Sequence, residues 1–471
     1  MQLQSMEQLN TAAEDTICAI STAPGTGGIA VIRVSGTDTI KNVSKIWVGK
    51  ELDTLHTHTA HLGRIQNSQK ETLDEVVLTL FRSPRSFTGE DVIEISCHGS
   101  QWIQQEIVSS LIAAGCRAAK GGEFSKRAFM NGKLDLSQAE AIADVIASSS
   151  KAAHKIAMSQ MRGDFSKMIN QLRDSLLDFC ALLELELDFS EEEVEFADRQ
   201  KLTENATSIH TTLEHLAGSF KTGNAIKNGF PVAIVGEPNA GKSTLLNRLL
   251  HDDKALVSDI RGTTRDIIED TITIDGILFR FIDTAGIRQT TDKIESMGIE
   301  RAYKKMEDAS IILWLIDPTQ ETDINELAKE ILPKASDCQL IAVINKIDNV
   351  EDAVIEKIKA QIVKECGPIQ ISTISAKEDI NVNKLEEALI AVAQKDYNPA
   401  EILITNARHY DALHNAALAI SRAIDGLHAG ISGDFIAQDI RETIHYLSEI
   451  TGEITTNDIL GNIFANFCIG K

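Results

Sequence analysis

The sequence predicts a multidomain protein in which an N-terminal α+β domain is followed by an all-α helical domain, with an α/β domain inserted into the helical one. Three observations support this prediction. Short apolar stretches bounded by turn residues precede residue 130, helical patterns occupy two stretches beyond it, and Gly236–Ser243 lies between those stretches and fits the phosphate-loop pattern GxxxxGKS. At 471 residues, the chain has room for about three domains.

These patterns divide the chain into four segments. We expect an α+β domain at 1–130, a first helical segment at 131–226, the α/β domain at 227–392 and a second helical segment at 393–471. Each helical segment carries an apolar stripe that needs a partner, so we expect the two to form one discontinuous domain. Such an insertion is allowed where the termini of a domain lie close together at its surface.

The first segment contains four strand patterns and one helix pattern. Residues 16–20, 29–34, 76–81 and 92–98 are short apolar stretches flanked by turn residues, as in strands. Residues 102–114 repeat apolar side chains at helical spacing, which predicts a helix. Strands combined with a helix in this way are typical of an α+β domain.

Helical patterns dominate the next part of the chain. Apolar residues in 165–183 recur at spacings of four and three, which predicts one long helix. We expect helical structure to resume near residue 205 and to end near Gly223. After the α/β segment, apolar stripes at 410–427 and 436–447 predict helix again.

The phosphate-loop motif has the flanking structure that its chemistry requires. The apolar stretch 231–235 predicts a buried strand before it, and the residues from Thr244 predict a helix after it. Backbone N–H groups at such a junction surround an anionic phosphate. We expect Lys242 to reach the β- and γ-phosphates and Ser243 to ligate Mg²⁺. The predicted nucleotide contacts in this motif are Asn239, Ala240, Gly241, Lys242, Ser243 and Thr244.

Three further motifs each follow an apolar strand pattern. They comprise Asp283, Thr284, Ala285 and Gly286, then Asn345, Lys346 and Asp348, and finally Ser375, Ala376 and Lys377. Open parallel sheets bind ligands at the carboxyl ends of their strands, so the motifs should meet there. The carboxylate of Asp348 can accept hydrogen bonds from the N1–H and 2-amino group of guanine, a donor pair that adenine lacks. The sequence therefore predicts a Ras-like P-loop GTPase domain.

A candidate switch segment follows the phosphate loop by about twenty residues. Its predicted nucleotide contacts are Ser258, Asp259, Ile260, Arg261, Gly262, Thr263 and Thr264. We expect Thr264 to close onto Mg²⁺ and the γ-phosphate, with Thr263 as the alternative. Ile287 stands where Ras-type enzymes carry a water-orienting Gln, so either hydrolysis is slow or another group orients the water. Glu295 is a candidate for that role, although a Glu in such a segment is more often only solvated.

Composition indicates a chain without a membrane span and bears on its partners. The sequence has no apolar run of about 18 residues and no signal-peptide pattern, and its seven cysteines are scattered without metal-ligand spacing, as expected in the cytoplasm. The net charge of −23 argues against a large basic face for nucleic acid. Seven acidic residues fall within Glu184–Glu195, where we expect a solvated surface, with a docking surface for a basic partner as the alternative.

Several motifs together resemble those of the MnmE (TrmE) family of tRNA-modification GTPases, over Asp15–Lys471. They are Gly262-Thr263-Thr264-Arg265-Asp266, Asp283-Thr284-Ala285-Gly286-Ile287-Arg288, Gly89-Glu90-Asp91, Gly122-Glu123-Phe124-Ser125, Lys133-Leu134-Asp135-Leu136 and Cys468-Ile469-Gly470-Lys471. The resemblance implies a homodimer whose GTPase domains meet across their nucleotide faces, and hydrolysis that K⁺ activates.

The resemblance also assigns ions and catalytic residues in the GTPase site. It implies that K⁺ takes the place of an arginine finger and that Glu295 is catalytic. The implied K⁺ ligands are Asn239, Ser258, Ile260 and Thr263. Ser258 stands where Thr is expected in relatives, which keeps a hydroxyl. A cation beside the β- and γ-phosphate oxygens would neutralise charge that builds up in the transition state.

For the N-terminal domain, the resemblance implies a tetrahydrofolate-binding and dimerisation domain similar to the T-protein of glycine cleavage. The implied ligand is 5,10-methylenetetrahydrofolate or 5-formyltetrahydrofolate, bound by Arg33, Glu94, Lys133 and Lys471. Arg and Lys suit the folate carboxylates, and Glu suits the pterin. The terminal motif implies a catalytic thiol at Cys468.

The function that the resemblance implies is tRNA modification. With the flavoprotein MnmG (GidA), in a heterotetramer, such a protein attaches an aminomethyl or carboxymethylaminomethyl group to C5 of wobble uridine 34, taking the one-carbon unit from folate. FAD is expected only in the partner, because no GxGxxG fingerprint opens a strand–helix unit here, and the partner is expected to bind most of the tRNA. Two alternatives stay open: a ribosome-assembly GTPase of the Era/Der kind, and a folate enzyme with a regulatory GTPase domain.

Overall fold

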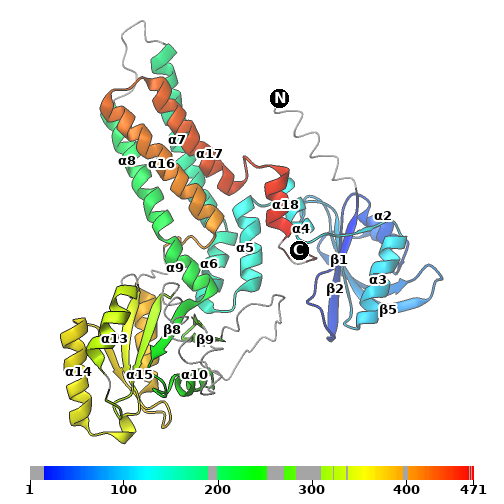
Figure 1. The fold of residues 1–471 in the computed structure, drawn as a ribbon. Helices are drawn as coiled ribbons and strands as arrows, with labels where there is room; N and C mark the ends of the chain where they lie inside the picture. The colour runs from blue at the N-terminus through cyan, green and yellow to red at the C-terminus, as the bar shows by residue number, and fades with distance from the viewer. Residues whose placement is uncertain are drawn as a thin grey trace. The chain divides into compact units, whose positions relative to one another are not determined.

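The computed structural model describes residues 15–188, 199–251, 270–282, 309–321, 323–335, 338–395, 401–465, 467 and 469–470. The chain forms two compact units, whose elements are labelled in Figure 1. The first unit comprises Met1–Ala147, Met158–Thr207 and Leu418–Lys471, and the second comprises Ser148–Ala157 and Ser208–Ala417. Three of the four limits between the units fall inside α6 (Lys151–Met161), α8 (Arg199–Gly218) and α16 (Ala407–Ala429), and the fourth lies between Ala147 and Ser148.

A seven-stranded sheet forms the N-terminal part of the first unit, in the order β3-β4-β5-β6-β2-β1-β7. Its strands are β1 (Ile17–Ile20), β2 (Ile29–Ser35), β3 (Trp47–Val48), β4 (Thr59–Gln66), β5 (Thr72–Phe81), β6 (Val92–His98) and β7 (Arg117–Ala118). Neighbouring strands are antiparallel except β1 and β7. The four strands predicted from the sequence are confirmed. The prediction misses β4 because its only large apolar residues are Leu62 and Ile65, and Leu62 is 74% exposed.

One face of this sheet builds the core of the N-terminal part. The elements that accompany the sheet are α2 (Thr39–Ser44), η1 (Leu52–Thr54) and α3 (Gln101–Ala113). The predicted helix is therefore confirmed as α3, whose buried Ile107 and Leu111 belong to the same core cluster as Ile32 of β2. Because side chains alternate along a strand, Arg33 and its cross-strand partner Glu94 lie on the opposite face.

The remainder of the first unit is helical. Its helices include α4 (Glu123–Met130), α5 (Leu136–Ala147), α7 (Asp164–Asp188), α17 (Gly433–Thr451) and α18 (Asn457–Ala465). The long predicted helix is confirmed as α7, and the buried residues of its stripe are Phe165, Ile169, Leu176, Phe179 and Leu183. α7 and α17 lie side by side (Figure 1), although the inserted α/β segment separates them in sequence. The helical domain is therefore discontinuous. Among the described helices, none combines the length and the apolar composition needed to span a bilayer.

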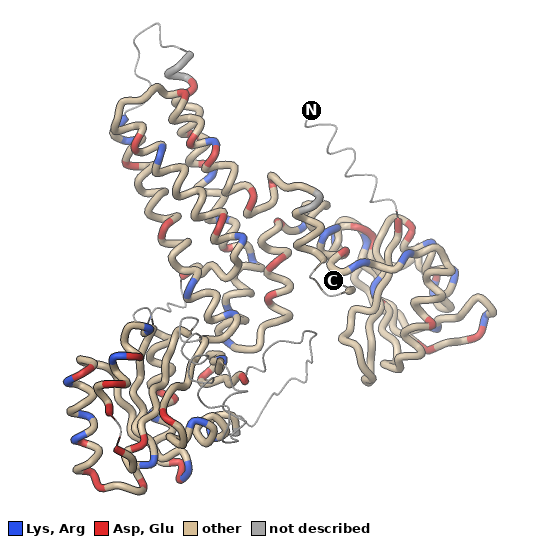
Figure 2. Tube along the Cα trace, viewed as in Figure 1, with Lys and Arg blue, Asp and Glu red and all other residues tan. Residues whose placement is uncertain are grey.

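The acidic segment of the sequence begins at the end of α7. Glu184 forms an ion pair with Arg441 of α17, and its hydrogen bond with Arg441 lowers the pKa of the Glu184 carboxyl. The side chains of the other members, from Glu186 to Glu195, lie outside the described part of the structure. Along the helices that are described, acidic and basic positions are interspersed (Figure 2).

The expectation that helical structure ends near Gly223 is wrong. Helix α8 ends at Gly218, and α9 (Phe220–Asn228) continues past Gly223. The glycine serves close packing instead, because a Cβ on Gly223 would lie 2.2 Å from the carbonyl oxygen of Ile404. The missing side chain thus marks the approach of another backbone rather than a helix end.

A six-stranded sheet in the order β13-β12-β11-β8-β10-β9 forms the centre of the second unit. Its strands are β8 (Phe230–Gly236), β9 (Asp270–Ile274), β10 (Ile277–Phe281), β11 (Ile311–Ile316), β12 (Gln339–Ile344) and β13 (Gln370–Thr373). The described helical elements between them are α10 (Lys242–His251), α13 (Ile324–Ile331), η3 (Leu332–Lys334), η4 (Ile347–Asn349) and α14 (Asp352–Cys366), with α15 (Val382–Lys395) after β13. All pairs are parallel except β9 with β10. The four strands predicted in this segment are confirmed.

The strand order of this sheet reverses at β8. The chain first builds β9 and β10 on one side of β8, and then crosses to β11, β12 and β13 on the other. Ligands of open parallel sheets bind outside the carboxyl ends of the strands at such a reversal. The carboxyl ends of β8 and β11 therefore mark the place where a ligand site is expected.

Candidate functional sites

The phosphate loop lies at this reversal. It leaves β8 at Gly236 and enters α10 at Lys242, so it joins a strand to a helix N-terminus as the motif requires. Gly241 has φ +98°, and a Cβ there would lie 2.3 Å from Nδ2 of Asn345. A glycine is needed at this position both for the backbone conformation and for the approach of Asn345.

The ammonium of Lys242 is enclosed by the loop that precedes it. Nζ donates hydrogen bonds to the carbonyl oxygens of Gly236 at 2.6 Å and Glu237 at 2.9 Å. The side chain is half-buried. The positive charge therefore lies within the loop, where backbone N–H groups and a cation can together receive phosphate oxygens.

Asn345 joins the phosphate loop to two other strand ends. It is 2% exposed and follows β12 directly. Its Nδ2 donates to the carbonyl oxygen of Ala240 at 2.9 Å, and its Oδ1 accepts from the backbone N–H of Ala376 at 3.0 Å. One buried amide thus holds together three of the loops predicted to contact the nucleotide.

Lys346 provides a second link to the phosphate loop. Its Nζ donates to the carbonyl oxygen of Asn239 at 2.7 Å and to Oδ2 of Asp317 at 2.7 Å. Asp317 belongs to none of the predicted motifs. Burial alone would raise the pKa of the Asp317 carboxyl, but Lys346 and Thr319 outweigh it and hold this pKa below its ordinary value. The signal available in the sequence is the position of Asp317 directly after the apolar strand β11, at the same sheet edge as the motifs.

The residues predicted to bind the base lie beside these links. Asp348 is exposed in η4 and accepts a hydrogen bond from Nδ2 of Asn349 at 2.8 Å. Ser375 is buried, and it exchanges two backbone hydrogen bonds of 3.0 Å with Ile380, which shapes the loop that includes Ala376. The carboxylate of Asp348 therefore remains accessible to the donors of a base, in the loop that follows β12.

The structure describes only part of the predicted nucleotide and ion contacts. Those that lie outside the described residues are Ser258, Asp259, Ile260, Arg261, Gly262, Thr263, Thr264, Asp283, Thr284, Ala285, Gly286 and Glu295. Cys468 and Lys471 also lie outside them. Their roles stay predictions.

The second candidate site, on the N-terminal sheet, is centred on Arg33 and Glu94. Nε and Nη2 of Arg33 both donate to Oε1 of Glu94, at 3.0 and 2.7 Å. The guanidinium also lies 5.2 Å from the ring centroid of Phe87 and 5.7 Å from that of Phe124. The side chains of the pair are 16% and 28% exposed, so a ligand can still reach it.

The C-terminal residues come to the same sheet. The carbonyl oxygen of Gly470 accepts from Oγ of Ser21 at 3.1 Å and from Nη1 of Arg33 at 3.5 Å. Ile469 forms an antiparallel bridge with Gly121. The predicted folate residue Lys133 instead donates from Nζ to the carbonyl oxygen of Pro84 at 3.0 Å. The structure therefore brings Arg33, Glu94 and the chain end together.

Two of the family-like motifs form an ion-pair network rather than a ligand site. Arg127, whose side chain is 8% exposed, binds Glu90 at 3.1 Å, Asp15 at 2.5 Å and Glu123 at 3.4 Å. Arg117 also pairs with Asp15 and Glu123. Burial would raise the pKa of Asp15 and of Glu123, but the arginines outweigh it and hold both pKa values below their ordinary range. The motifs containing Glu90 and Glu123 thus stabilise the N-terminal part of the fold.

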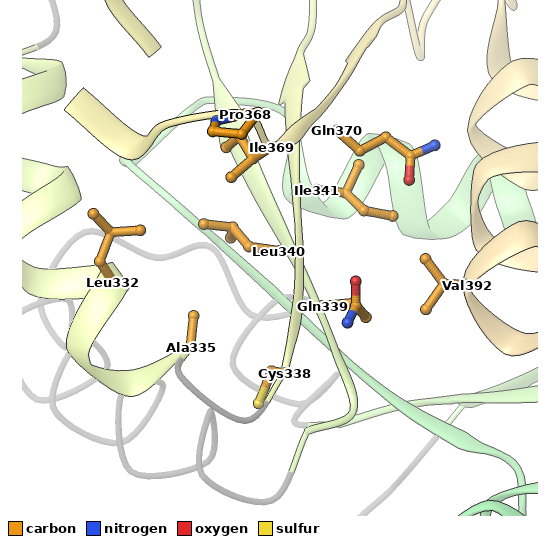
Figure 3. A pocket seen from close by; sticks show the side chains of 10 residues that line it. All are labelled: Leu332, Ala335, Cys338, Gln339, Leu340, Ile341, Pro368, Ile369, Gln370 and Val392. Atoms are coloured by element: carbon orange, nitrogen blue, oxygen red, sulfur yellow. The ribbon is translucent and has the colours of Figure 1, made fainter. Parts of the chain in front are cut away.

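A pocket in the second unit lies at the other end of the sheet from the nucleotide motifs. Its volume is about 360 Å³, and Figure 3 shows its side chains, with Gln339 and Gln370 at the first residues of β12 and β13. Most of the other labelled side chains are apolar, among them Leu332, Leu340 and Ile369. The predicted nucleotide residues follow the last residues of these strands, so this pocket is not the nucleotide site.

Comparison with known proteins identifies similar families and relatives. Residues 16–133 match the family described as GTP-binding protein TrmE N-terminus, and residues 136–468 match the MnmE helical domain. The tRNA modification GTPase MnmE of Parabacteroides distasonis is 53% identical to this chain, covering 97% of the chain and 100% of that protein. The protein of the same name in Bacteroides thetaiotaomicron is also 53% identical, with the same coverage. Among solved structures, Era of Aquifex aeolicus is 29% identical over 40% of this chain and 66% of its own, with a TM-score of 0.28.

Proposed function

This chain belongs to the MnmE family of tRNA modification GTPases, and from that premise we propose that it hydrolyses GTP while installing a group at C5 of wobble uridine 34 in tRNA. The group is aminomethyl or carboxymethylaminomethyl. The observation that carries the proposal is the relationship over 97% of the chain, which includes both the GTPase motifs and the N-terminal domain. A ribosome-assembly GTPase of the Era/Der kind should lack that N-terminal domain.

The geometry of the second unit supports GTP as the substrate. Lys242 lies within a phosphate loop at a helix N-terminus, and Asn345 ties that loop to the base motifs. Asp348 is exposed at the end of the same edge, where its two carboxylate oxygens can accept from guanine. Phosphate binding and base selection thus come from one connected set of strand ends.

The same loop fits the two cations that the family implies. Ser243 places a hydroxyl in the first turn of α10, and a hard oxygen donor of this kind suits Mg²⁺. Asn239 is exposed in the loop at φ +62°, and its amide oxygen is of the ligand type that suits K⁺. When bound, the two cations supply positive charge beside the β- and γ-phosphate oxygens.

We assign the remaining ligands and the catalytic group by the family resemblance. Thr264 is the proposed second Mg²⁺ ligand, and Ser258, Ile260 and Thr263 complete the proposed K⁺ site. Glu295 is the proposed catalytic residue, because Ile287 has no group that can orient water. Closure of a homodimer across the nucleotide faces would bring these segments together.

We propose that the N-terminal sheet binds a tetrahydrofolate derivative that carries a one-carbon unit. The partly exposed pair Arg33–Glu94 offers a guanidinium and a carboxylate beside the half-buried ring of Phe87, which fits a flat heterocycle with carboxylate groups. Lys133 and Lys471 are the further proposed folate contacts. Gly470 accepts from Arg33, which supports a position for Cys468 near this ligand and its proposed role as a catalytic thiol.

The proposed partners are a second copy of this chain, MnmG (GidA) and tRNA. The net charge of −23 and the interspersed charges in Figure 2 support a complex in which MnmG binds most of the tRNA, since tight phosphate binding needs a basic face. FAD would belong to MnmG, and the complex to the cytoplasm. The domain limits at residues 130, 226 and 392 remain part of the proposal.

Hydrolysis by the purified chain in different salts tests the GTPase part of the proposal. GTP turnover measured in KCl and in NaCl at equal ionic strength should be faster in KCl. Asn239→Ala should reduce that difference, whereas Asn228→Ala, at an exposed asparagine of α9, should leave it unchanged. Equal turnover in both salts would contradict the K⁺ site.

A further inference from the structure

Asp317 is a buried carboxylate beside the nucleotide site whose two oxygens both have partners. It follows β11 directly and is 2% exposed. Oδ1 accepts from the backbone N–H of Thr319 at 3.0 Å and from its Oγ1 at 2.7 Å. Oδ2 accepts from Nζ of Lys346 at 2.7 Å. A carboxylate held by bonds to both oxygens has one fixed orientation, and so does the ammonium that it binds.

Lys346 links the fixed carboxylate of Asp317 to the phosphate loop. The same Nζ that binds Asp317 donates to the carbonyl oxygen of Asn239 at 2.7 Å. Lys346 has φ +57° and Asn239 has φ +62°, a left-handed conformation that residues with side chains seldom adopt. Contacts must hold two such residues in place, and the bonds from Nζ join both to Asp317.

We infer that Asp317 is a positioning residue for guanine-nucleotide binding, acting through Lys346 on the phosphate loop. It fixes the separation between the loop that selects the base and the loop that receives the phosphates. A site with fixed loops loses less conformational entropy when the nucleotide binds. The inference rests on the proposed GTP-binding function and adds a residue that belongs to no nucleotide motif.

A purely structural role would use Asp317 differently. An Asp that accepts from the backbone two residues later closes a turn, and the bonds to Thr319 do this with Oδ1 alone. Oδ2 is left for Lys346. The variant that separates the two roles is Asp317→Asn, because its amide oxygen can keep the Thr319 bonds while its NH₂ faces the ammonium of Lys346, a donor against a donor.

The test is the dissociation rate of a fluorescent GDP analogue from the full chain, measured in Na⁺ buffer by displacement with excess GDP. Asp317→Asn should release the analogue roughly tenfold faster or more, as expected for the loss of a hydrogen bond to a charged group. Asp323→Asn is the matched control, because it removes the same charge from the exposed N-cap of α13 while an Asn can still cap the helix. Its dissociation rate should equal that of the wild type.

A double-mutant cycle with Lys346→Met identifies the route of the effect. If Asp317 acts through Lys346, Asp317→Asn should change the dissociation rate much less in the Lys346→Met background. An effect of equal size in both backgrounds, or no effect in the wild-type background, would overturn the inference. A wild-type chain that does not bind the GDP analogue would overturn the proposed function itself.

The melting temperature of Asp317→Asn shows whether this variant is folded at the assay temperature. If it is not, Thr319→Val is measured in its place. Thr319→Val removes one of the two bonds to Oδ1 and nearly preserves the side-chain shape. It should release the analogue faster than the wild type but more slowly than a folded Asp317→Asn variant. An unchanged rate in Thr319→Val, with Asp317→Asn unfolded at the assay temperature, would also count against the inference.

Discussion

The side-chain amide of Asn345 bridges Ala240 and Ala376, with Nδ2 of Asn345 2.9 Å from the carbonyl oxygen of Ala240. Ala240 and Ala376 are both buried, at 0% and 3% exposure. The bridge places the phosphate loop and the base loops in one connected unit.

Replacing Asn345 should therefore weaken both the fold and the nucleotide site. In Asn345→Ala, the buried carbonyl of Ala240 and the N–H of Ala376 each lose a partner, at a cost of about 1–3 kcal/mol per group. We expect a lower melting temperature without nucleotide and weaker binding of GDP. Asn228→Ala, in an exposed position of the same unit, is the control. Equal melting temperatures for Asn345→Ala and wild type would contradict the bridge.

Changing Asp348 should alter which base is bound. The Asp348→Asn amide can donate to the 2-oxo group of xanthine but cannot accept both donors of guanine. We expect the affinity for GTP to fall about a hundredfold, since two hydrogen bonds to a charged group are lost, while that for xanthosine triphosphate rises. Competition against a fluorescent GDP analogue measures this change. An unchanged order of GTP over xanthosine triphosphate would exclude Asp348 as the base-selecting residue.

Gly223 and Gly218 should respond in opposite ways to the same substitution. Gly223→Ala places a Cβ 2.2 Å from the carbonyl oxygen of Ile404 and should lower the unfolding free energy by more than about 1 kcal/mol. A Cβ at Gly218 meets nothing within 4 Å, so Gly218→Ala should be neutral or stabilising by up to about 1 kcal/mol. Thermal unfolding compares the two variants. A stable Gly223→Ala protein would contradict the close packing of α9 against Ile404.

The network around Arg127 predicts acid sensitivity of the N-terminal part. Asp15 and Glu123 have lowered pKa values in the folded state, so the folded protein binds protons less readily than the unfolded chain. Their stabilisation is complete above the ordinary carboxyl pKa of about 4 and is lost as the pH falls through the lowered folded values.

The double variant Asp15→Asn/Glu123→Gln tests this sign. It should melt below the wild type at pH 7, and its melting temperature should fall less steeply between about pH 5 and pH 3. Calorimetry at several pH values measures both effects. Parallel curves for the two proteins would mean that the carboxylates contribute nothing to acid unfolding.

Four of the six strands of the second unit, β8, β10, β12 and β13, were predicted from their apolar stretches, because buried parallel strands are rich in apolar residues, as in β12. No prediction was made for β9 or β11. β4 was not predicted because three of its eight positions are exposed and few of its residues are large and apolar. Nucleotide-site residues that belong to a sequence motif, such as Asn345 and Lys346, could be predicted from that motif. Asp317 could not be identified in this way, because its importance comes from the spatial approach of Lys346 from another strand.

In the N-terminal site, too, local sequence patterns do not reveal which residues come into contact. The resemblance named Arg33 and Glu94, but only the antiparallel register of β2 and β6 brings them into a cross-strand pair. The contact of Gly470 with Arg33 joins residues from the two ends of the chain, which local sequence patterns cannot reveal. The prediction that helical structure ends near Gly223 failed for a related reason. The backbone that lies against Gly223 belongs to Ile404, which is remote in sequence.

The modification state of tRNA tests the central claim most directly. Nucleoside mass spectrometry would compare tRNA from cells that lack this chain with tRNA from cells complemented by the wild type or by Cys468→Ser. We predict that the C5-modified wobble uridine disappears in the deletion, returns with the wild type and fails to return with Cys468→Ser. Full modification of uridine 34 in cells without the chain would contradict its assignment to tRNA modification.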